Sequence, residues 1–134
     1  MGGLELEAWE ERVMTEGVGT ESARIADLLE ATGDAFESGE LEWGQGAARI
    51  WRGEDSDGTA QWAFCLIGGL NRMNNLHNAS IWNAIAVVGK HLGLADYHSV
   101  PAWNDKADRT VDEVVDALKG TAKDIRNQLE PGDE

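Results

Sequence analysis

Very few residues in this sequence have the type and spacing that catalysis or metal binding requires. The single cysteine, Cys65, lies in an apolar run, so we expect a buried, inert thiol instead of a nucleophile. His77, His91 and His98 invite a metal-site interpretation, but no HxxxH or HxxE pair fixes their geometry. We therefore predict no catalytic residue, no metal site and no cofactor.

The segment Asp55–Gly58 resembles the start of a calcium-binding loop. An EF-hand would then need an acidic residue seven positions after Asp57, and Phe64 stands there. We therefore expect Ser56 or Asp57 to cap the helix that follows. No glycine-rich loop in the sequence carries the lysine of a phosphate-binding P-loop.

That helix is predicted over residues 58–73, where apolar side chains occur on nearly every side. A helix that is hydrophobic all round belongs inside a fold, and this one is shorter than the roughly 20 residues of a membrane span. Gly68 and Gly69 each cost about 1 kcal/mol of helix stability relative to alanine. A close crossing by another helix would explain two glycines at this point.

Two more helices are predicted from apolar spacing and end signals. The helix over residues 20–32 is followed by Gly33, a residue type that favours the position after the last turn. The helix over residues 79–92 has Asn78 as its N-cap, and Gly93 after it is typical of a Schellman ending.

The last helix is the clearest prediction. Thr110 and Glu113 match a capping box, in which each side chain accepts a hydrogen bond from the other residue's backbone amide. Between the helices, residues 37–57 are expected to form a loop with a short helical turn around residues 47–51, and a short hairpin is the alternative. Residues 95–109 are expected to form a second loop.

These elements predict an all-α fold: a single compact domain, residues 1–134, of four to five helices around the central helix at about 58–73. Residues 1–18 are expected to form a weakly ordered N-terminal segment with a helix over residues 4–16, and residues 131–134 an acidic tail. A chain of this length buries roughly two-thirds of its unfolded surface.

The charge is strongly acidic and unevenly distributed. The net charge is −14 at pH 7, and residues 1–60 hold 15 acidic residues against 4 basic ones. This balance argues against direct binding to nucleic acid, whose phosphates need Lys and Arg, and against binding to an anionic membrane surface. We see no signal-peptide pattern and expect a cytoplasmic protein.

Three segments resemble an uncharacterised family of small proteins from actinobacteria and their phages. The first is Trp43-Gly44-Gln45-Gly46-Ala47. The second, Phe64–Leu70, is similar to a family run that usually reads Trp-Cys, two apolar residues and Gly-Ala-Leu, so Phe64 and Gly69 depart from it. The third is Trp103-Asn104-Asp105, followed by Arg109-Thr110, Glu113-Val114 and Ala117-Leu118. The resemblance covers about residues 22–125 and implies a domain of unknown function, with no activity to transfer.

The residues that match the family define a candidate site for a ligand or partner: Trp43, Gln45, Trp103, Asn104, Asp105 and Arg109. In the interpretation that we favour, Asn104 and Asp105 form local turns and Asp105 pairs with Arg109. In the other, Gln45, Asn104 and Asp105 surround a small polar pocket between the two tryptophans. A lone aspartate with amides lacks the second carboxylate or base that hydrolysis commonly needs.

Three functions are therefore considered. The leading one is a non-catalytic, acidic interaction or regulatory protein of actinobacterial accessory or phage origin, which binds a host or cognate protein. The second is an acidic nucleic-acid mimic that occupies the basic groove of a DNA-binding host protein through Glu40, Glu42, Glu54, Asp55 and Asp57. The third is a small-ligand binder or hydrolase that uses Asp105 and Gln45.

Overall fold

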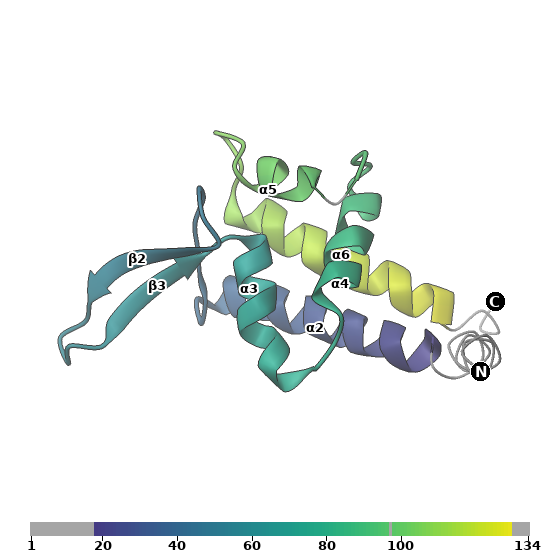
Figure 1. Cartoon of the computed structure of the whole chain (residues 1–134), viewed down its shortest axis with the longest axis horizontal. Helices are drawn as coiled ribbons and strands as arrows, with labels where there is room; N and C mark the ends of the chain where they lie inside the picture. The colour runs from purple at the N-terminus through teal and green to yellow at the C-terminus, as the bar shows by residue number, and fades with distance from the viewer. Residues whose placement is uncertain (1–17, 97, 130–134) are drawn as a thin grey trace, which may run out of the picture.

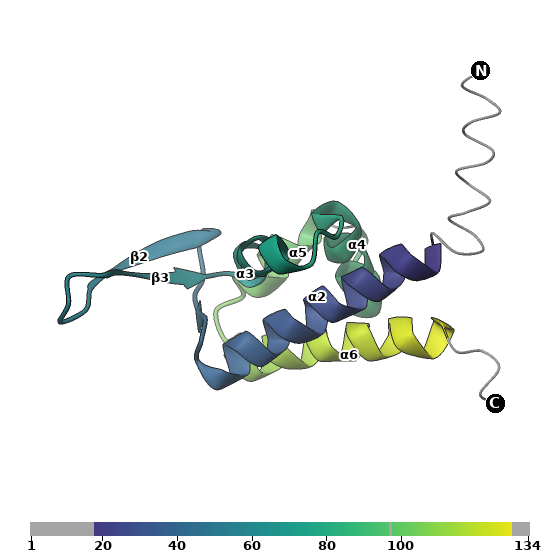
Figure 2. The ribbon, with the colours of Figure 1, turned by 90° about the horizontal axis from the view of Figure 1, so that it is seen from below.

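The computed structural model describes residues 18–96 and 98–129. Two long helices, α2 (Val18–Ser38) and α6 (Val111–Leu129), lie side by side and run in opposite directions (Figures 1 and 2). Between them in the chain come β1 (Glu42–Trp43), β2 (Arg49–Glu54), β3 (Ala60–Phe64), α3 (Leu66–Met73), the 3-10 helix η2 (Asn74–Leu76), α4 (Ile81–His91) and α5 (Ser99–Asn104). The predicted helix over residues 4–16 and the acidic tail at 131–134 lie outside the described residues.

A glycine inside α2 allows α6 to pack closely against it. A Cβ atom at Gly33 would lie 3.0 Å from Cγ of Lys119 and 3.5 Å from Cβ of Leu118. The predicted end of this helix at residue 32 is therefore wrong: α2 continues past Gly33 and ends before Gly39, whose φ is +87°. The glycine thus serves a helix–helix contact and does not end the helix.

The ends of α4 and α6 are set by local hydrogen bonds. Ser80 is the N-cap of α4, two residues after the predicted Asn78. The predicted Schellman ending is confirmed, since the Leu94 N–H donates to the Gly89 carbonyl at 2.9 Å and Gly93 has a φ of +75°.

The predicted capping box of α6 is also confirmed. The Glu113 N–H donates to Oγ1 of Thr110 at 3.2 Å, and the Thr110 N–H donates to Oε1 of Glu113 at 2.9 Å. The predicted loop at residues 95–109 contains the short helix α5, which buries Val100 completely.

The prediction of an all-α fold is wrong, because the chain also contains a three-stranded mixed sheet with the strand order β1-β3-β2. β1 pairs in parallel with the end of β3, and β2 pairs with β3 in an antiparallel hairpin. The turn of the hairpin is the Asp55–Gly58 segment, where the Gly58 N–H donates to the Asp55 carbonyl and Gly58 has a φ of +82°. Ser56 and Asp57 therefore do not cap a helix.

The predicted central helix at residues 58–73 is a strand followed by a short helix. Ala60–Phe64 forms β3 and only Leu66–Met73 forms α3. A short apolar run fits a buried strand as well as a buried helix, so its periodicity does not decide between them. The pairing with β2 decides it here, and that partner strand lies in the predicted loop at 37–57.

The close helix crossing predicted at the two glycines of α3 is found at Gly69, whereas Gly68 faces a loop. A Cβ atom at Gly69 would lie 2.6 Å from Cζ of Phe36 in α2, and one at Gly68 would lie 1.8 Å from the Ala48 carbonyl oxygen. Gly69 thus permits a helix crossing, and Gly68 permits contact with the loop before β2. Among the described residues, no helix has the length and apolar content needed to cross a bilayer.

Candidate functional site

Asn104 at the end of α5 ties together three segments of the chain. Its side chain is 1% exposed. Oδ1 accepts hydrogen bonds from Nε1 of Trp43 at 2.7 Å and from the Leu66 N–H at 3.1 Å. Nδ2 donates to the Gly44 carbonyl at 3.2 Å and to Oδ1 of Asp105 at 2.9 Å. All four hydrogen-bonding positions of the amide are therefore used inside the protein.

Gln45 and Asp105 extend this network to the surface. Nε2 of Gln45 donates to the carbonyl oxygens of Asn104 at 2.9 Å and Lys106 at 2.7 Å. Oδ1 of Asp105 accepts from the Gly46 N–H at 2.9 Å. We call the group of Trp43, Gln45, Asn104 and Asp105 the Asn104 junction. It fastens the loop between β1 and β2 to the connection between α5 and α6.

Trp103 and Arg109 form a second group next to the junction. The Arg109 guanidinium carbon lies 3.9 Å from the centre of the Trp103 ring, and Nε donates to the Trp103 carbonyl at 2.8 Å. The carboxylate partner of Arg109 is Glu113, whose Oε2 lies 3.1 Å from Nη1 of the guanidinium. The predicted pairing of Asp105 with Arg109 is therefore wrong. The structure thus brings the six predicted residues into two adjacent groups. Their role in binding stays a prediction.

Cys65 lies beside the junction, and the prediction of an interior helical position for it is wrong. It is the N-cap of α3 and not an interior helical residue, and its Sγ accepts a hydrogen bond from the Gly68 N–H at 3.4 Å. The prediction of a buried thiol is confirmed, because Cys65 is 7% exposed. Burial raises the pKa of the thiol above its usual 9.0, and this effect exceeds the lowering by the Gly68 amide.

A histidine–aspartate pair connects α4 with α6. Nδ1 of His91 lies 2.6 Å from Oδ2 of Asp124, beside a cavity of about 320 Å³. Nε2 of the ring faces Gly120, where an added Cβ atom would lie 2.9 Å away. The ring therefore packs against α6 at Gly120 while it also lines the cavity. Within the described ranges, no three His, Cys, Asp or Glu residues are grouped to hold a metal ion.

The face of the β2–β3 hairpin that carries two tryptophans was not predicted as a site. Arg49 is opposite Phe64, and Trp51 is opposite Trp62, so all four side chains lie on one face of the ribbon. We call these four residues the hairpin face. The Arg49 guanidinium carbon lies 4.3 Å from the centre of the Trp62 ring, and Trp51 is 59% exposed. No clear sequence signal indicated this face, because Trp62-Ala63-Phe64 is apolar throughout and fits a helix as well as a strand.

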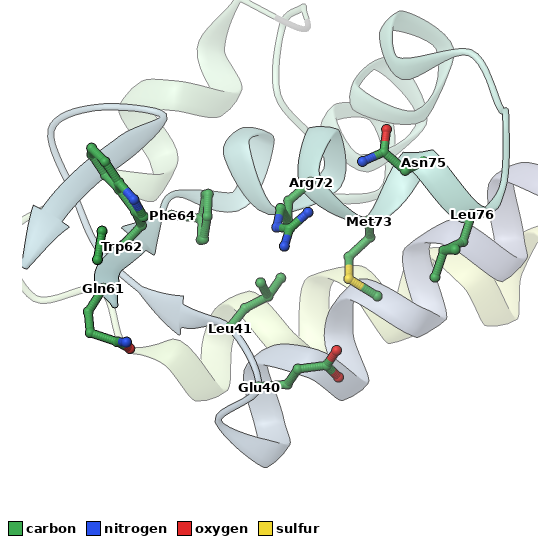
Figure 3. A pocket seen from close by; sticks show the side chains of 10 residues that line it. Glu40, Leu41, Gln61, Trp62, Phe64, Arg72, Met73, Asn75 and Leu76 are labelled. Carbon is green, nitrogen blue, oxygen red and sulfur yellow. The ribbon is translucent and has the colours of Figure 1, made fainter. Parts of the chain in front are cut away.

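A groove of about 500 Å³ runs beside the hairpin face (Figure 3). Its walls come from the connection between α2 and β1, from β3 and from the α3–η2 segment. It is lined by Glu40, Leu41, Ala60, Gln61, Trp62, Phe64, Arg72, Met73, Asn75 and Leu76. No single segment contains these residues, so no local pattern in the sequence indicated the groove.

A second, smaller cleft adjoins the groove. It has a volume of about 270 Å³ and is lined by Ala48, Arg49, Phe64, Gly68, Asn71 and Arg72. Phe64 and Arg72 line both hollows, so the groove and the cleft are adjacent. The cleft, which we call the arginine cleft, has two arginines and no acidic residue in its lining.

The comparison with known protein families decides what the chain is related to. A family model described as a family of unknown function, DUF6197, matches residues 20–124. The chain belongs to DUF6197. No curated protein and no solved structure matches the chain.

The DUF6197 match contains both candidate surfaces. The Asn104 junction and the Trp103–Arg109 group lie within residues 20–124, and so do the hairpin face, the groove and the arginine cleft. Because the function of the family is unknown, membership does not choose between these surfaces. The choice depends on their geometry.

Proposed function

We propose that this DUF6197 protein is a non-catalytic interaction protein that binds another protein through the hairpin face. The observation that carries the proposal is the exposure of Trp51, which is 59% exposed on a strand that projects from the helical body (Figures 1 and 2). Tryptophan and arginine are the residue types that contribute most to binding energy in protein interfaces. Both occur here side by side.

The shape of the hairpin supports this proposal. A two-stranded ribbon by itself is at best marginally stable in water. The tip of the hairpin is exposed on both strands, from Arg52 to Gln61 apart from the half-buried Gly53. A ribbon that leaves the core in this way gains stability if a partner covers its aromatic face.

The Asn104 junction gives less support to catalysis or ligand binding. The amide of Asn104 and the Nε2 atom of Gln45 already bond within the chain. A hydrolytic site would need these groups directed at a substrate, with a base beside Asp105. We therefore assign the junction the role of holding the sheet against the helices.

The nucleic-acid mimic also receives less support, because its acidic residues do not form one free surface. Glu42 pairs with Arg52 at 2.9 Å. Oδ1 of Asp55 accepts hydrogen bonds from the Asp57 and Thr59 amides in the hairpin turn. A cytoplasmic location belongs to this proposal as well, and the lone cysteine is consistent with it.

The test compares two exposed tryptophans on different elements. The full chain, its Trp51→Thr variant and its Trp82→Thr variant are used for affinity capture from a native host lysate. Trp82 lies on α4 and is 68% exposed, so its variant controls for nonspecific binding by an exposed tryptophan. We expect Trp51→Thr to lose the captured protein at unchanged melting temperature and Trp82→Thr to retain it. Equal capture by both variants would contradict the proposal.

A further inference from the structure

We propose that the hairpin face and the groove bind an extended peptide segment of the partner, which adds to the free edge of β3 and places a carboxylate between Arg49 and Arg72. This inference rests on the proposed function and specifies the chemistry of the partner. The recognised segment contains apolar side chains and at least one acidic residue.

The free edge of β3 provides the place for an added strand. β1 pairs only with Ala63 and Phe64, so residues 60–62 have a strand neighbour on the β2 side alone. The groove begins where the chain before β1 diverges from β3, at Glu40 and Leu41. An extended peptide in the groove would continue the line of β1 and bond to the backbone of residues 60–62.

The other free edge of the sheet is less suited to this pairing. β2 has a bulge between Trp51 and Gly53, where the register shifts against β3, and Gly53 has a φ of +108°. Bulges and charged side chains on an edge strand hinder the addition of another strand. Arg49, Arg52 and Glu54 supply such charges on β2.

The groove offers apolar contacts to alternate side chains of the peptide. Leu41 and Phe64 are almost completely buried at its floor, and Met73 is half-buried at its wall. Leu76 at the far end is 80% exposed. In Figure 3 the side chain of Arg72 points into the space between Leu41 and Met73. A peptide that covers Leu76 with an apolar side chain would place its adjacent residues near Arg72.

The unpaired arginines indicate the charge of that peptide. Four arginines in the described part of the chain each form an ion pair with a carboxylate: Arg24, Arg52, Arg109 and Arg126. The two exceptions among residues 18–96 and 98–129 are Arg49 and Arg72, and both line the arginine cleft. Stacking on Trp62 holds the Arg49 guanidinium in place and leaves its in-plane N–H groups open. A carboxylate between the two would complete the pairing that the chain itself leaves open.

A peptide fits these features better than a nucleic acid does. Nucleic acids need a Lys or Arg for each neutralised phosphate along the backbone. This chain carries a net charge of −14 and offers two arginines in the cleft, which suffice for one or two carboxylates. The wider field of the protein repels a polyanion.

The test is a selection of random ten-residue peptides, displayed on phage, against the full chain. We expect enriched sequences to combine Asp or Glu with apolar residues at alternate positions. Arg49→Gln and Arg72→Gln should each weaken the binding of a selected synthetic peptide by about tenfold, as expected for a lost charged hydrogen bond. The matched control is Arg52→Gln, because Arg52 pairs with Glu42 and does not line the cleft. The affinity of this variant for the peptide should equal that of the parent chain.

Hydrogen exchange on the same complex tests the mode of binding. We expect the amides of residues 60–62 to gain protection and those on the free edge of β2 to gain none. Enrichment of peptides without acidic residues, or equal affinity of Arg72→Gln and the parent chain, would overturn this inference. If the selected peptides lack acidic residues but bind the Trp51→Thr variant more weakly than the parent chain, the proposed function stands and this inference is wrong. If Trp51→Thr changes the affinity of no selected peptide, both are wrong. Tighter binding of the single-stranded oligonucleotide dT20 than of any peptide would also overturn it.

Discussion

At the scale of single residues, Asn104 has the largest structural role of the predicted site residues. It satisfies the indole of Trp43 and the first amide of α3, both of which would otherwise lack a partner in the interior. Its own side chain is buried in the process. Such a residue is needed for folding whether or not a ligand binds nearby.

Replacing Asn104 with alanine should therefore destabilise the protein strongly. A buried donor without an acceptor costs about 1–3 kcal/mol. Asn104→Ala leaves the buried Leu66 amide and the partly buried Trp43 indole without their acceptor, so we expect a loss of about 3 kcal/mol in urea denaturation. Asn127→Ala, at an exposed position of α6, is the control and should change stability by less than about 0.5 kcal/mol. A loss for Asn104→Ala as small as that of the control would mean that the junction does not hold the fold.

Cys65 gives a second prediction at this scale, on reactivity and pH. Its pKa is raised because burial disfavours the thiolate, so the folded protein should react slowly with iodoacetamide at pH 8 and at the rate of a free thiol in urea. The raised pKa also means that stability from the neutral thiol is complete below pH 9 and decreases as the pH rises through the folded pKa. Equal alkylation rates in the folded and unfolded chain would contradict this account.

At the scale of elements, local sequence signals predicted two helix ends correctly, but they placed β3 in a helix. The capping box of Thr110 and Glu113 and the glycine ending at Gly93 were predictable because each is formed within a few residues. β3 was not, because Trp62 and Phe64 fit a helix or a strand until the pairing with β2 is known. The candidate residues of the junction came from a family resemblance, whereas the groove is formed by three separated segments.

The capping box should make the stability of α6 depend on pH. The hydrogen bond from the Thr110 amide is the main reason why the pKa of Glu113 is held below its usual 4.5, and Arg109 adds to this effect. A lowered pKa means that the contribution is present above about pH 4.5 and is lost as the pH falls through the folded value. We expect Glu113→Ala to be less stable than the parent chain at pH 7 and equally stable at pH 2. A stability difference that does not shrink on acidification would contradict this.

The two glycines at helix crossings should respond in opposite ways to alanine. At Gly69 the new methyl group would meet the Phe36 ring at 2.6 Å in the core, so Gly69→Ala should cost about 1–3 kcal/mol. At Gly33 it would meet the flexible Lys119 side chain at 3.0 Å, so the gain of about 1 kcal/mol in helix propensity should prevail. Thermal denaturation of both variants measures this. Destabilisation by Gly33→Ala to the same extent as by Gly69→Ala would contradict the expectation and show that the α2–α6 contact yields no more easily than the α2–α3 contact.

At the scale of the whole molecule, the strongly acidic chain keeps the two described arginines that lack an ion pair near Trp62 of the hairpin: Arg49 stacks on its ring, and Arg72 lines the same groove. The sequence indicated the acidity but not this basic cleft, because Arg49 on β2 and Arg72 on α3 line one cleft only in the folded chain. Opposite the sheet, α2 and α6 form a paired scaffold with ion pairs between Arg126 and both Asp27 and Glu30. The molecule thus combines a rigid helical body with a projecting contact surface.

The role of the hairpin face and the groove in binding can be measured by hydrogen exchange of the full chain, free and in complex with the protein captured from its host. We expect the complex to gain protection in β3, in the β2 amides that face β3 and along the groove as far as Leu76, while the exchange of the Asn104 junction is unchanged. Protection confined to the junction and the Trp103–Arg109 group, with the hairpin exchanging as it does in the free protein, would contradict it.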